Sequence, residues 1–276
     1  MTVLTCGHYA LDLSKKTIIM GILNATPDSF SDGGQFDEVS QAVARAKEMV
    51  ADGADIIDIG GESTRPGHEP VSAEEEIRRV VPIIRAIVKE VDVPVSIDTY
   101  KASTAEAAVE AGATIINDVW GSKRDPDIAK VAARFGVPIV LMHNRKNRNY
   151  EQFIDEVWKD LQESIAIAER AGLQKEQIIL DPGIGFVKSH AQNIEMMRSL
   201  DCLVEMGYPV LLGTSRKSMI GNILDLPTTE RMEGTGATVC FGIQKGCHIV
   251  RVHDVKEMSR MSKVMDALIG KVESDG

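Results

Sequence analysis

Carboxylate and carboxamide side chains end three apolar runs of this chain, where they could bind a ligand that is rich in N–H donors. Asp98, Asn117 and Asp181 each close such a run. Removing these groups from water is costly unless they are hydrogen-bonded. Each alone could bond to neighbouring loop backbone, but the three together favour a ligand with ring N–H and amino groups. A carboxylate that faces an amidine-like edge accepts two parallel hydrogen bonds, as it does from arginine.

To bind one ligand, these three side chains need a fold that brings the ends of the apolar runs together. Continuous apolar runs are typical of parallel strands covered on both faces, and each stretch between them is long enough for one helix. Eight units of this kind predict an α/β fold, a single (β/α)8 TIM barrel, with its active site at the carboxyl ends of the strands. An open doubly wound sheet would not explain eight equivalent polar endings. The runs start near Ile18, Ile56, Val95, Ile115, Pro138, Ile178, Val210 and Ile249.

Helical periodicity between the runs supports the barrel. Ser72 and Glu75 predict a capping box before the second helix. Residues 4–13 alternate loosely around Gly7 and predict a short N-terminal hairpin at the bottom of the barrel, within one domain that covers 1–276. We expect helices over 39–49, 73–91, 102–109, 128–135, 153–171, 194–206, 233–244 and 255–269. Glycines typical of the position after a helix are Gly53, Gly112, Gly136, Gly172, Gly207 and Gly246.

Composition excludes several classes of function. The formal net charge of −10 argues against a general nucleic-acid or membrane surface, because either would repel the chain at long range. No leader-like segment and no apolar run of membrane-spanning length occurs, so we expect a cytoplasmic protein. The four cysteines lack metal-like spacing and are most simply reduced packing residues. The basic loop 144–148 is most simply a solvated loop.

Cations after the last two runs predict an anion site. Lys217 and Ser218 follow the seventh run, and Arg251 and His253 alternate along the eighth, so their side chains lie on one face. Barrels commonly hold phosphate at the loops after strands seven and eight. The alternative is an ion pair with nearby acids such as Asp254.

Three loops are rich in glycine and proline, over 24–34, 60–67 and 181–186. The first two are longer than a typical connection in such a fold, and long loops at a catalytic face are often lids. No nucleophile has a base beside it, and the G-x-S-x-G elbow is absent. The chemistry predicted is electrostatic and positional: a polar heterocycle is held in the mouth beside a leaving phosphate group.

These segments together resemble those of the bacterial dihydropteroate synthase family. The resemblance runs in order over nearly the whole chain, and the first two loops are specific signatures. One departure is Ala25, where the family usually has a branched aliphatic residue. The matching segments are 24–34, 60–67, 115–118, 181–186, 213–218 and 251–254. The resemblance implies a barrel that joins 7,8-dihydropterin-6-ylmethyl diphosphate to 4-aminobenzoate, which makes the chain a transferase of folate biosynthesis.

The resemblance also implies a role for particular residues. Asp181 would pair with the amino-pyrimidinone edge of the pterin. The rest of the pterin pocket would comprise Asp98, Asn117, Met142, Phe186, Gly213 and Lys217. Diphosphate would be held by Asn24, Arg251 and His253, with Asn24 also near Mg2+. The aminobenzoate pocket would comprise Phe30, Thr64, Arg65, Pro66 and Ser218.

The implied mechanism is dissociative: diphosphate departs first, and the arylamine then captures a pterin-methyl cation. Asp32 would stabilise that cation, and Mg2+ would neutralise the leaving group. Asp32, Lys217 and Asn24 are therefore the expected catalytic residues. Family members are commonly dimers through their last helices, so we expect a homodimer.

Two other functions stay open at this point. A methyltetrahydrofolate methyltransferase with a corrinoid partner would share the Asp and Asn endings, but it would not need residues 28–32, Arg65 or the strand-eight cations. A non-catalytic pterin-binding relative is the third possibility, and the intact first two loops argue against it.

Overall fold

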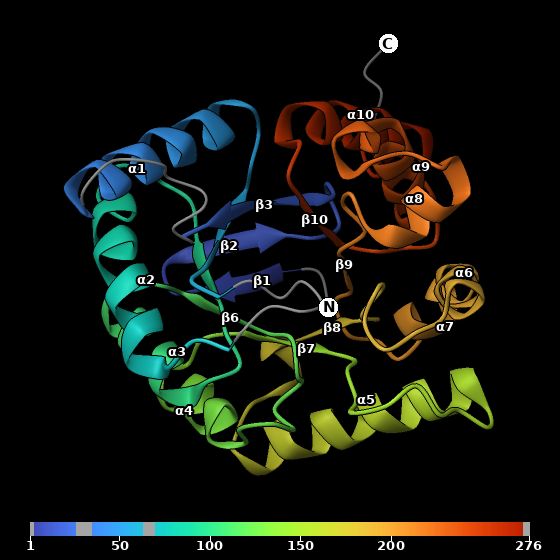
Figure 1. Ribbon diagram of the computed structural model, residues 1–276, viewed down its shortest axis with the longest axis horizontal. Coiled ribbons are helices and arrows are strands. Elements are labelled where there is room, and N and C mark those ends of the chain that lie inside the picture. The colour runs from blue at the N-terminus through green and yellow to red at the C-terminus, as the bar shows by residue number, and fades with distance from the viewer. Residues whose placement is uncertain (1–2, 26–34, 63–69, 273–276) are drawn as a thin grey trace.

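Ten strands and the helices between them build the fold in the computed structural model, which describes residues 3–25, 35–62 and 70–272. Figure 1 shows the helices arranged around the outside of the strands. The strands are β1 (Val3–Cys6), β2 (Tyr9–Asp12), β3 (Ile18–Asn24), β4 (Ile56–Gly60), β5 (Val95–Asp98), β6 (Ile115–Asp118), β7 (Ile139–Met142), β8 (Ile178–Asp181), β9 (Leu211–Leu212) and β10 (Ile249–Val252). The helices are α1 (Gln35–Ala51), α2 (Ala73–Ile87), α3 (Ala102–Glu110), α4 (Asp127–Phe135), α5 (Phe153–Arg170), α6 (His190–Arg198), α7 (Leu200–Val204), α8 (Ser218–Leu224), α9 (Met232–Gln244) and α10 (Val255–Leu268).

The eight parallel strands form one sheet in the order β8-β7-β6-β5-β4-β3-β10-β9. Its two edges meet at a parallel bridge between Leu180 of β8 and Val210, beside β9. The Leu180 amide also donates to the carbonyl of Pro209 at 2.9 Å. The sheet is therefore closed into the expected barrel, and all eight predicted strands are confirmed.

The barrel interior is filled from its amino end by apolar side chains. Every second residue of a strand points inward. This inner cluster comprises Ile18, Met20, Ile56, Ile115, Val140, Ile179, Leu211 and Ile249, together with Leu4, Cys6 and Leu13 of the N-terminal segment. Fully buried apolar side chains of this kind contribute about 1.5–3 kcal/mol each.

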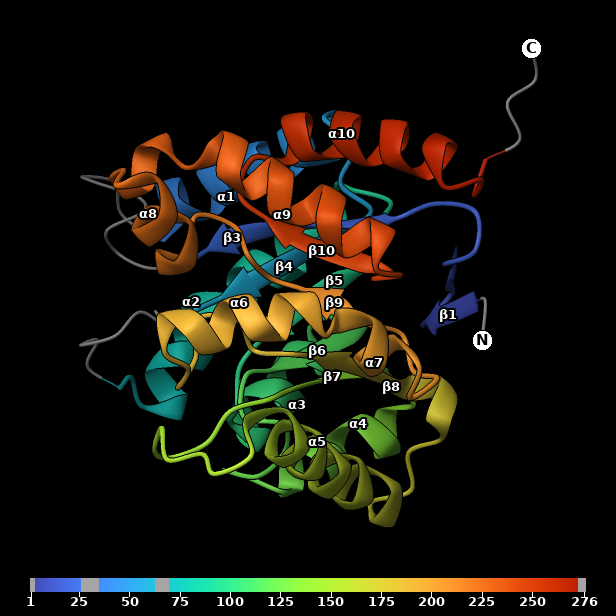
Figure 2. The ribbon, with the colours of Figure 1, turned by 90° about the vertical axis from the view of Figure 1, so that its right-hand side faces the viewer.

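The N-terminal hairpin covers the amino end of the barrel, as predicted. β1 and β2 pair antiparallel around Gly7, whose φ of +63° favours glycine. Leu4 and Cys6 are fully buried against the inner cluster. Figure 2 shows β1 at the end of the barrel opposite α8.

Helix ends follow the sequence signals with three differences. All six glycines predicted to follow a helix have positive φ. Ser72 caps α2 by accepting from the Glu75 amide at 3.2 Å, but the carboxylate of Glu75 binds Arg78 and Arg79, so the predicted reciprocal capping contact is wrong. The helix predicted over 194–206 is two helices, α6 and α7, which meet at Ser199. The short helix α8 was not predicted.

Candidate active site

A second inward layer, of mostly polar side chains, lies two residues beyond the apolar layer on most strands. Ile56 is followed at this spacing by Asp58, and Ile249 by Arg251. Since the side-chain period of a strand is two, these residues share the inner face one step closer to the carboxyl ends. The layer comprises Asp58, Asp98, Asn117, Met142, Asp181, Gly213 and Arg251. The predicted convergence of strand endings is therefore seen.

Arg251 is held by two carboxylates of this layer. Its Nε donates to Asp58 and its Nη2 to Asp98, each at 2.6 Å. Asn117 donates from Nδ2 to the same Asp58 oxygen at 3.1 Å. The alternative drawn from the sequence, an ion pair of these cations with nearby acids, is therefore seen for Arg251, but with Asp58 and Asp98; Asp254 binds Arg216 instead. The sequence did not single out Asp58 because it lies inside a run; its signal is an acidic residue in a strand that is otherwise apolar.

Burial and charge oppose each other at this cluster. Burial raises the pKa of Asp98 to about 7, and the nearby Arg251 guanidinium acts to lower it. The two carboxylates raise the pKa of Arg251, which therefore stays charged.

Asp181 lies at the end of β8, opposite Met142 in the register of β7. Its Oδ1 accepts from the amide of Gly183 at 2.7 Å, which fixes the orientation of the carboxylate. Burial raises the pKa of Asp181, and the positive charge of Lys217 opposes this shift. A carboxylate with one oxygen fixed in this way can present its second oxygen to a ligand.

Lys217 and Phe186 lie beside Asp181. The Lys217 ammonium donates to the carbonyl of Ile184 and stands 4.7 Å from the centre of the Phe186 ring. Burial lowers the pKa of Lys217 to about 8. Gly213 lies between these groups: a Cβ there would be 3.9 Å from Asp181 Oδ2 and 4.0 Å from Lys217 Nζ. Three of the predicted pterin residues, Asp181, Gly213 and Lys217, therefore lie close together.

The residues predicted for the diphosphate lie on neighbouring segments. Asn24 ends β3 with an exposed side chain. His253 follows β10, and both its amide and its Nδ1 lie within hydrogen-bond distance of Ser215 Oγ, at 3.1 and 2.9 Å. Ser218, predicted for aminobenzoate, is exposed and begins α8. The remaining predicted residues, Phe30, Asp32, Thr64, Arg65 and Pro66, lie outside the described residues.

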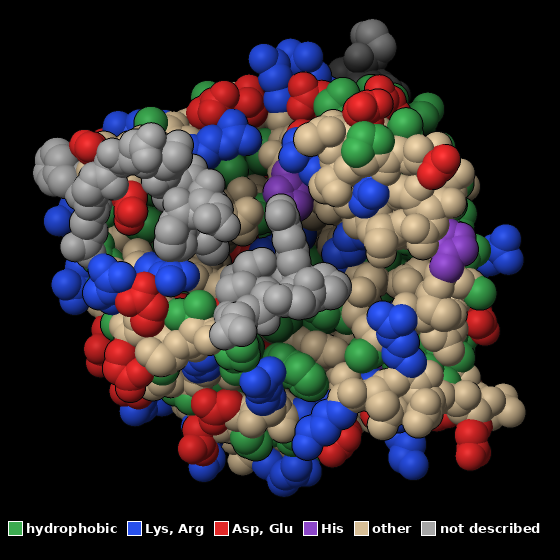
Figure 3. All heavy atoms as spheres, in the orientation of Figure 1, with side chains coloured by type: hydrophobic (Ala, Val, Ile, Leu, Met, Phe, Trp, Pro, Cys, Tyr) green, Lys and Arg blue, Asp and Glu red, His purple; other side chains and the backbone are tan. Residues whose placement is uncertain are grey.

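Two polar features near the mouth are structural. Asp118 accepts from the amides of Trp120 and Ser122 at 2.8 and 2.6 Å and shapes the turn after β6. In the basic loop, Arg145 pairs with Glu156 and Asp160 at 2.8 and 3.2 Å, so it is not simply solvated. The face shown in Figure 3 carries acidic and basic side chains interspersed, which leaves recognition of an anion to local groups.

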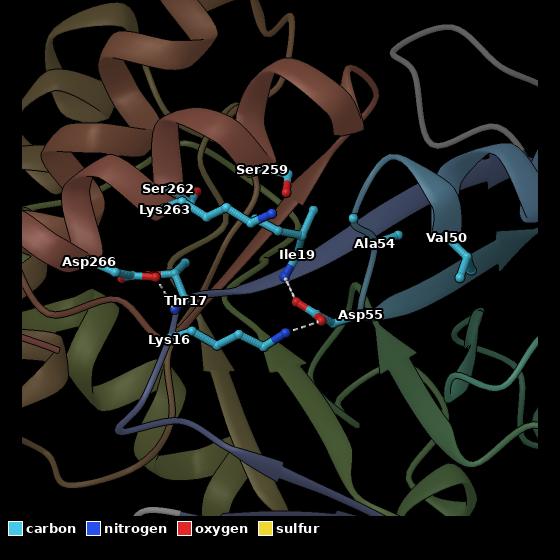
Figure 4. A pocket seen from close by; sticks show the side chains of 11 residues that line it. Lys16, Thr17, Ile19, Val50, Ala54, Asp55, Ser259, Ser262, Lys263 and Asp266 are labelled. Carbon is cyan, nitrogen blue, oxygen red and sulfur yellow. Dashed lines mark hydrogen bonds and ion pairs between the residues drawn. The ribbon is translucent and has the colours of Figure 1, made fainter. Parts of the chain in front are cut away.

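A separate pocket of about 210 Å3 lies near the amino end of β3, between α1 and α10. Figure 4 shows Lys16 bonded to Asp55 and Thr17 to Asp266. Thr17 donates to Asp266 from its amide and its hydroxyl at 2.7 and 2.6 Å. Because these groups already have partners and lie away from the carboxyl ends of the strands, this pocket is a weaker candidate than the mouth.

Over the described part of the chain, no group of three or more His, Cys, Asp or Glu side chains is arranged to hold a metal ion. The helices described are all too short or too polar to cross a membrane.

Known proteins share both sequence and fold with this chain. A sequence model described as "Pterin binding enzyme" matches residues 20–253. A dihydropteroate synthase of Bacillus subtilis is 61% identical over 262 residues, which cover 95% of this chain and 92% of the relative. A crystal structure of dihydropteroate synthase from Clostridium difficile in the presence of pteroic acid is 50% identical, with a TM-score of 0.91 and coverage of 94% of this chain and 98% of that one.

A second solved structure contains a smaller molecule, 4-aminobenzoic acid. Dihydropteroate synthase from Xanthomonas albilineans with 4-aminobenzoic acid is 41% identical, with a TM-score of 0.92 and coverage of 97% of this chain and 98% of that one. Matches of this extent cover the barrel strands and the loops at their carboxyl ends alike. The chain therefore belongs to the pterin binding enzyme family, and within it to the dihydropteroate synthases.

Proposed function

We propose that this chain joins 7,8-dihydropterin-6-ylmethyl diphosphate to 4-aminobenzoate and releases 7,8-dihydropteroate and diphosphate. The supporting observation is that Asp181 and Asn117 share the inward layer at the carboxyl ends of the strands, with the ammonium of Lys217 near Asp181. The names and bound molecules of the relatives agree with this reaction.

The pterin ring lies between the acids and Lys217 in this proposal. Asp181 keeps one oxygen on Gly183 and accepts from the amino-pyrimidinone edge of the pterin with its carboxylate. Asp98 and Asn117 bind further ring nitrogens. Met142 and Phe186 contact the ring, and Gly213 leaves room for it because it has no side chain.

The diphosphate lies toward Arg251, His253 and Asn24. Arg251 shares its guanidinium between the bound acids and the incoming phosphate oxygens, which carry more charge than either carboxylate. His253, two residues after Arg251 and just beyond the end of β10, adds a second hydrogen-bond donor. Loss of diphosphate is favoured because these groups stabilise the charge that develops on the leaving oxygen.

Magnesium fits this site as an ion carried mainly by the diphosphate. Among the described residues Asn24 is the single side chain assigned to it, and Mg2+ usually keeps several waters and binds few protein ligands beside substrate phosphates. When bound, the ion would neutralise charge on the leaving group.

Bond breaking precedes bond formation in the proposed mechanism. The C–O bond between the pterin methylene carbon and diphosphate breaks, and its electron pair leaves with the diphosphate. The amine nitrogen of 4-aminobenzoate then attacks the methylene carbon and loses a proton. Asp32 stabilises the intermediate cation, while Phe30, Thr64, Arg65, Pro66 and Ser218 form the aminobenzoate pocket.

A turnover assay tests this function. Purified protein with the pterin diphosphate, 4-aminobenzoate and Mg2+ is expected to release diphosphate and dihydropteroate in equal amounts. Aminobenzoate is expected to bind tightly only after pterin and diphosphate are in place. Pterin binding without turnover would favour a non-catalytic relative, and methyl transfer from methyltetrahydrofolate would favour the methyltransferase alternative.

The chain acts as a cytoplasmic homodimer of one domain, 1–276, in this proposal. Val264 and Leu268 lie one turn apart on α10 with 61% and 75% of their surface exposed, and Phe241 of α9 is also exposed. Apolar side chains gathered in this way are typical of an interface. Leu268→Glu is expected to convert the dimer to monomer in analytical ultracentrifugation, whereas Ile223→Glu on α8 should leave it unchanged.

A further inference from the structure

Two lysines hold the loop 182–187 between β8 and α6 from different sides. Lys217 donates to the carbonyl of Ile184 from the side of the mouth. Lys188 donates from Nζ to the carbonyls of Gly183 and Phe186 at 2.9 and 3.3 Å. Lys188 is only 4% exposed, so its ammonium group is removed from water. The reaction proposed above gives it no role.

The third contact of Lys188 favours its charged form. Its Nζ lies 2.7 Å from Nδ1 of His143, and Nε2 of His143 lies 3.1 Å from Asp160. Since Asp160 accepts, His143 carries its proton on Nε2 and presents Nδ1 as an acceptor. Lys188 bonds to all three neighbours only when it has the three N–H groups of the charged form.

The loop that Lys188 holds has an unusual backbone. Gly183, Gly185 and Val187 have φ values of +67°, +85° and +42°. A left-handed conformation is unfavourable for a branched residue such as Val187, so surrounding contacts must maintain it. A Cβ on Gly183 would lie 2.1 Å from the carbonyl oxygen of His143, which shows how closely the loop packs.

The loop in turn positions groups of the mouth. The Gly183 amide donates to Asp181 Oδ1, while the carbonyl of the same residue accepts from Lys188. The Phe186 carbonyl accepts from Lys188 as well, and the ring of Phe186 faces Lys217. One buried ammonium therefore restrains the supports of Asp181 and Lys217 together.

We propose that Lys188 is a positioning residue for pterin binding, which acts through the loop 182–187 and is kept charged by His143 and Asp160. It contacts no substrate. The inference rests on the function proposed above, because it takes Asp181 and Lys217 as ligands of the pterin.

Four charged side chains act on Lys188. Burial lowers the pKa of Lys188 to about 7; Asp181 and Asp160 favour its charged form, while Lys217 and Lys123 disfavour it. His143 has its own pKa lowered to about 4 by burial, so it stays neutral near pH 7. Removing Asp160 should therefore favour the neutral amine, and removing Lys123 should favour the ammonium.

The first experiment compares two lysine variants by calorimetry with a pterin fragment that lacks the diphosphate. Lys188→Met is expected to weaken binding about 10- to 100-fold, because small displacements of positioned groups have effects of that size. Lys123→Met, which removes a half-buried charge near the same cluster without touching the loop, is expected to keep near wild-type affinity. A purely structural role would lower the Tm of Lys188→Met and leave the affinity of its folded fraction unchanged.

The second experiment measures fragment affinity against pH in Asp160→Asn and Lys123→Met. The fragment and Lys217 titrate in both variants, so differences between the curves report the change at Lys188. Affinity is expected to fall as rising pH removes the proton from Lys188. The midpoint of this fall should move to lower pH in Asp160→Asn and to higher pH in Lys123→Met. Shifts in the same direction, or none, would overturn the inference.

The outcomes separate this inference from the proposed function. A wild-type protein that binds no pterin fragment would overturn both. A wild-type protein that binds it, with Lys188→Met folded and equally tight, would overturn the role of Lys188 alone. If Lys188→Met does not fold, the opposed pH shifts of the second experiment decide the matter.

Discussion

Arg251 and Asp58 form a 2.6 Å ion pair although 193 positions separate them in the sequence. Arg251 lies on β10 and Asp58 on β4, with β3 between the two strands. Asp58 is fully buried, and its Oδ1 has no hydrogen-bond partner among the described residues. Asn117 also donates to Asp58, but the guanidinium supplies the positive charge that neutralises this buried acid at the mouth of the site.

Replacing Arg251 should destabilise the free protein. Arg251→Met leaves Asp58 and Asp98 without their cation, and breaking a buried pair in this way costs about 3–5 kcal/mol. The loss should be larger at pH 8 than at pH 5. Without Arg251 the pKa of Asp98 in the folded protein rises further above its ordinary value of 3.8, so the stability of the variant falls as pH increases from about 4 toward the raised folded pKa. Urea denaturation of the wild-type protein and Arg251→Met at pH 5 and pH 8 measures the loss in free energy of unfolding.

Lys16→Met provides the control for that measurement. Lys16 pairs with Asp55 at 2.5 Å but is 54% exposed, and exposed pairs contribute about 0–1 kcal/mol. Equal losses of stability in the two variants would show that Arg251 serves no buried charge.

Asp181→Asn should abolish most pterin binding without unfolding the protein. An amide oxygen can still accept from Gly183, but the side chain can no longer accept both hydrogen bonds from the pterin edge. The expected loss is about 2–4 kcal/mol in affinity for a pterin fragment, measured by calorimetry.

Asp118→Asn is the matched control for Asp181→Asn. Asp118 is also a buried strand-end carboxylate, but both its oxygens accept backbone amides of its own turn. Its replacement is expected to change stability and to leave pterin affinity near wild type. Near-normal binding by a folded Asp181→Asn would remove Asp181 from the pterin site.

The strands and the converging site could be predicted because each depends on local pattern. The run 178–181 is apolar until its last residue, so the residues that form the core and the residue that could bind a ligand are distinguishable in the sequence. Asp58 could not be predicted in this way. It lies in the middle of β4, and its partner Arg251 becomes a neighbour only when the barrel closes.

The role of Lys188 was hidden for a related reason. In the sequence it is one basic residue after a glycine-rich loop, which is most often solvated. Its burial depends on His143, which lies 45 positions earlier and after a different strand. The break between α6 and α7 at Ser199 was missed because apolar spacing continues through it.

Gly213→Ala should block the site and leave the fold almost unchanged. The added Cβ would lie 3.9 Å from Asp181 Oδ2 and 4.0 Å from Lys217 Nζ, which are ordinary contact distances in the free protein. The same methyl group occupies space where the pterin would lie. We expect at least about a tenfold loss of fragment affinity, equivalent to about 1.4 kcal/mol, with an unchanged denaturation midpoint.

Gly21→Ala should behave in the opposite way. A Cβ at Gly21 would meet Met49 Sδ and Val255 Cγ2, each at 3.1 Å, on the outer side of β3. Overpacking of this kind typically costs about 1–3 kcal/mol of stability. Pterin affinity should stay near wild type. If Gly213→Ala binds the fragment normally, the pterin does not lie over Gly213.

Acid should destabilise the protein through the seam where the barrel closes. His248 Nδ1 accepts from the amide of Val210 at 3.2 Å, and Val210 forms the bridge to Leu180. Burial lowers the pKa of His248 to about 4. Because the unfolded state binds a proton near pH 6.5 and the folded state does not, stability contributed above pH 6.5 is lost as pH falls from about 6.5 to 4.

His248→Asn isolates this contribution. The asparagine oxygen can accept from Val210 as Nδ1 does, but it does not titrate. Between pH 7 and pH 4.5 the wild-type protein should lose on the order of 2 kcal/mol more free energy of unfolding than His248→Asn does. Hydrogen exchange at the Val210 amide should speed up in acid in the wild-type protein and much less in the variant. Equal acid losses in both proteins would place the sensitive group elsewhere, with His143 as the next candidate because its pKa is also lowered to about 4.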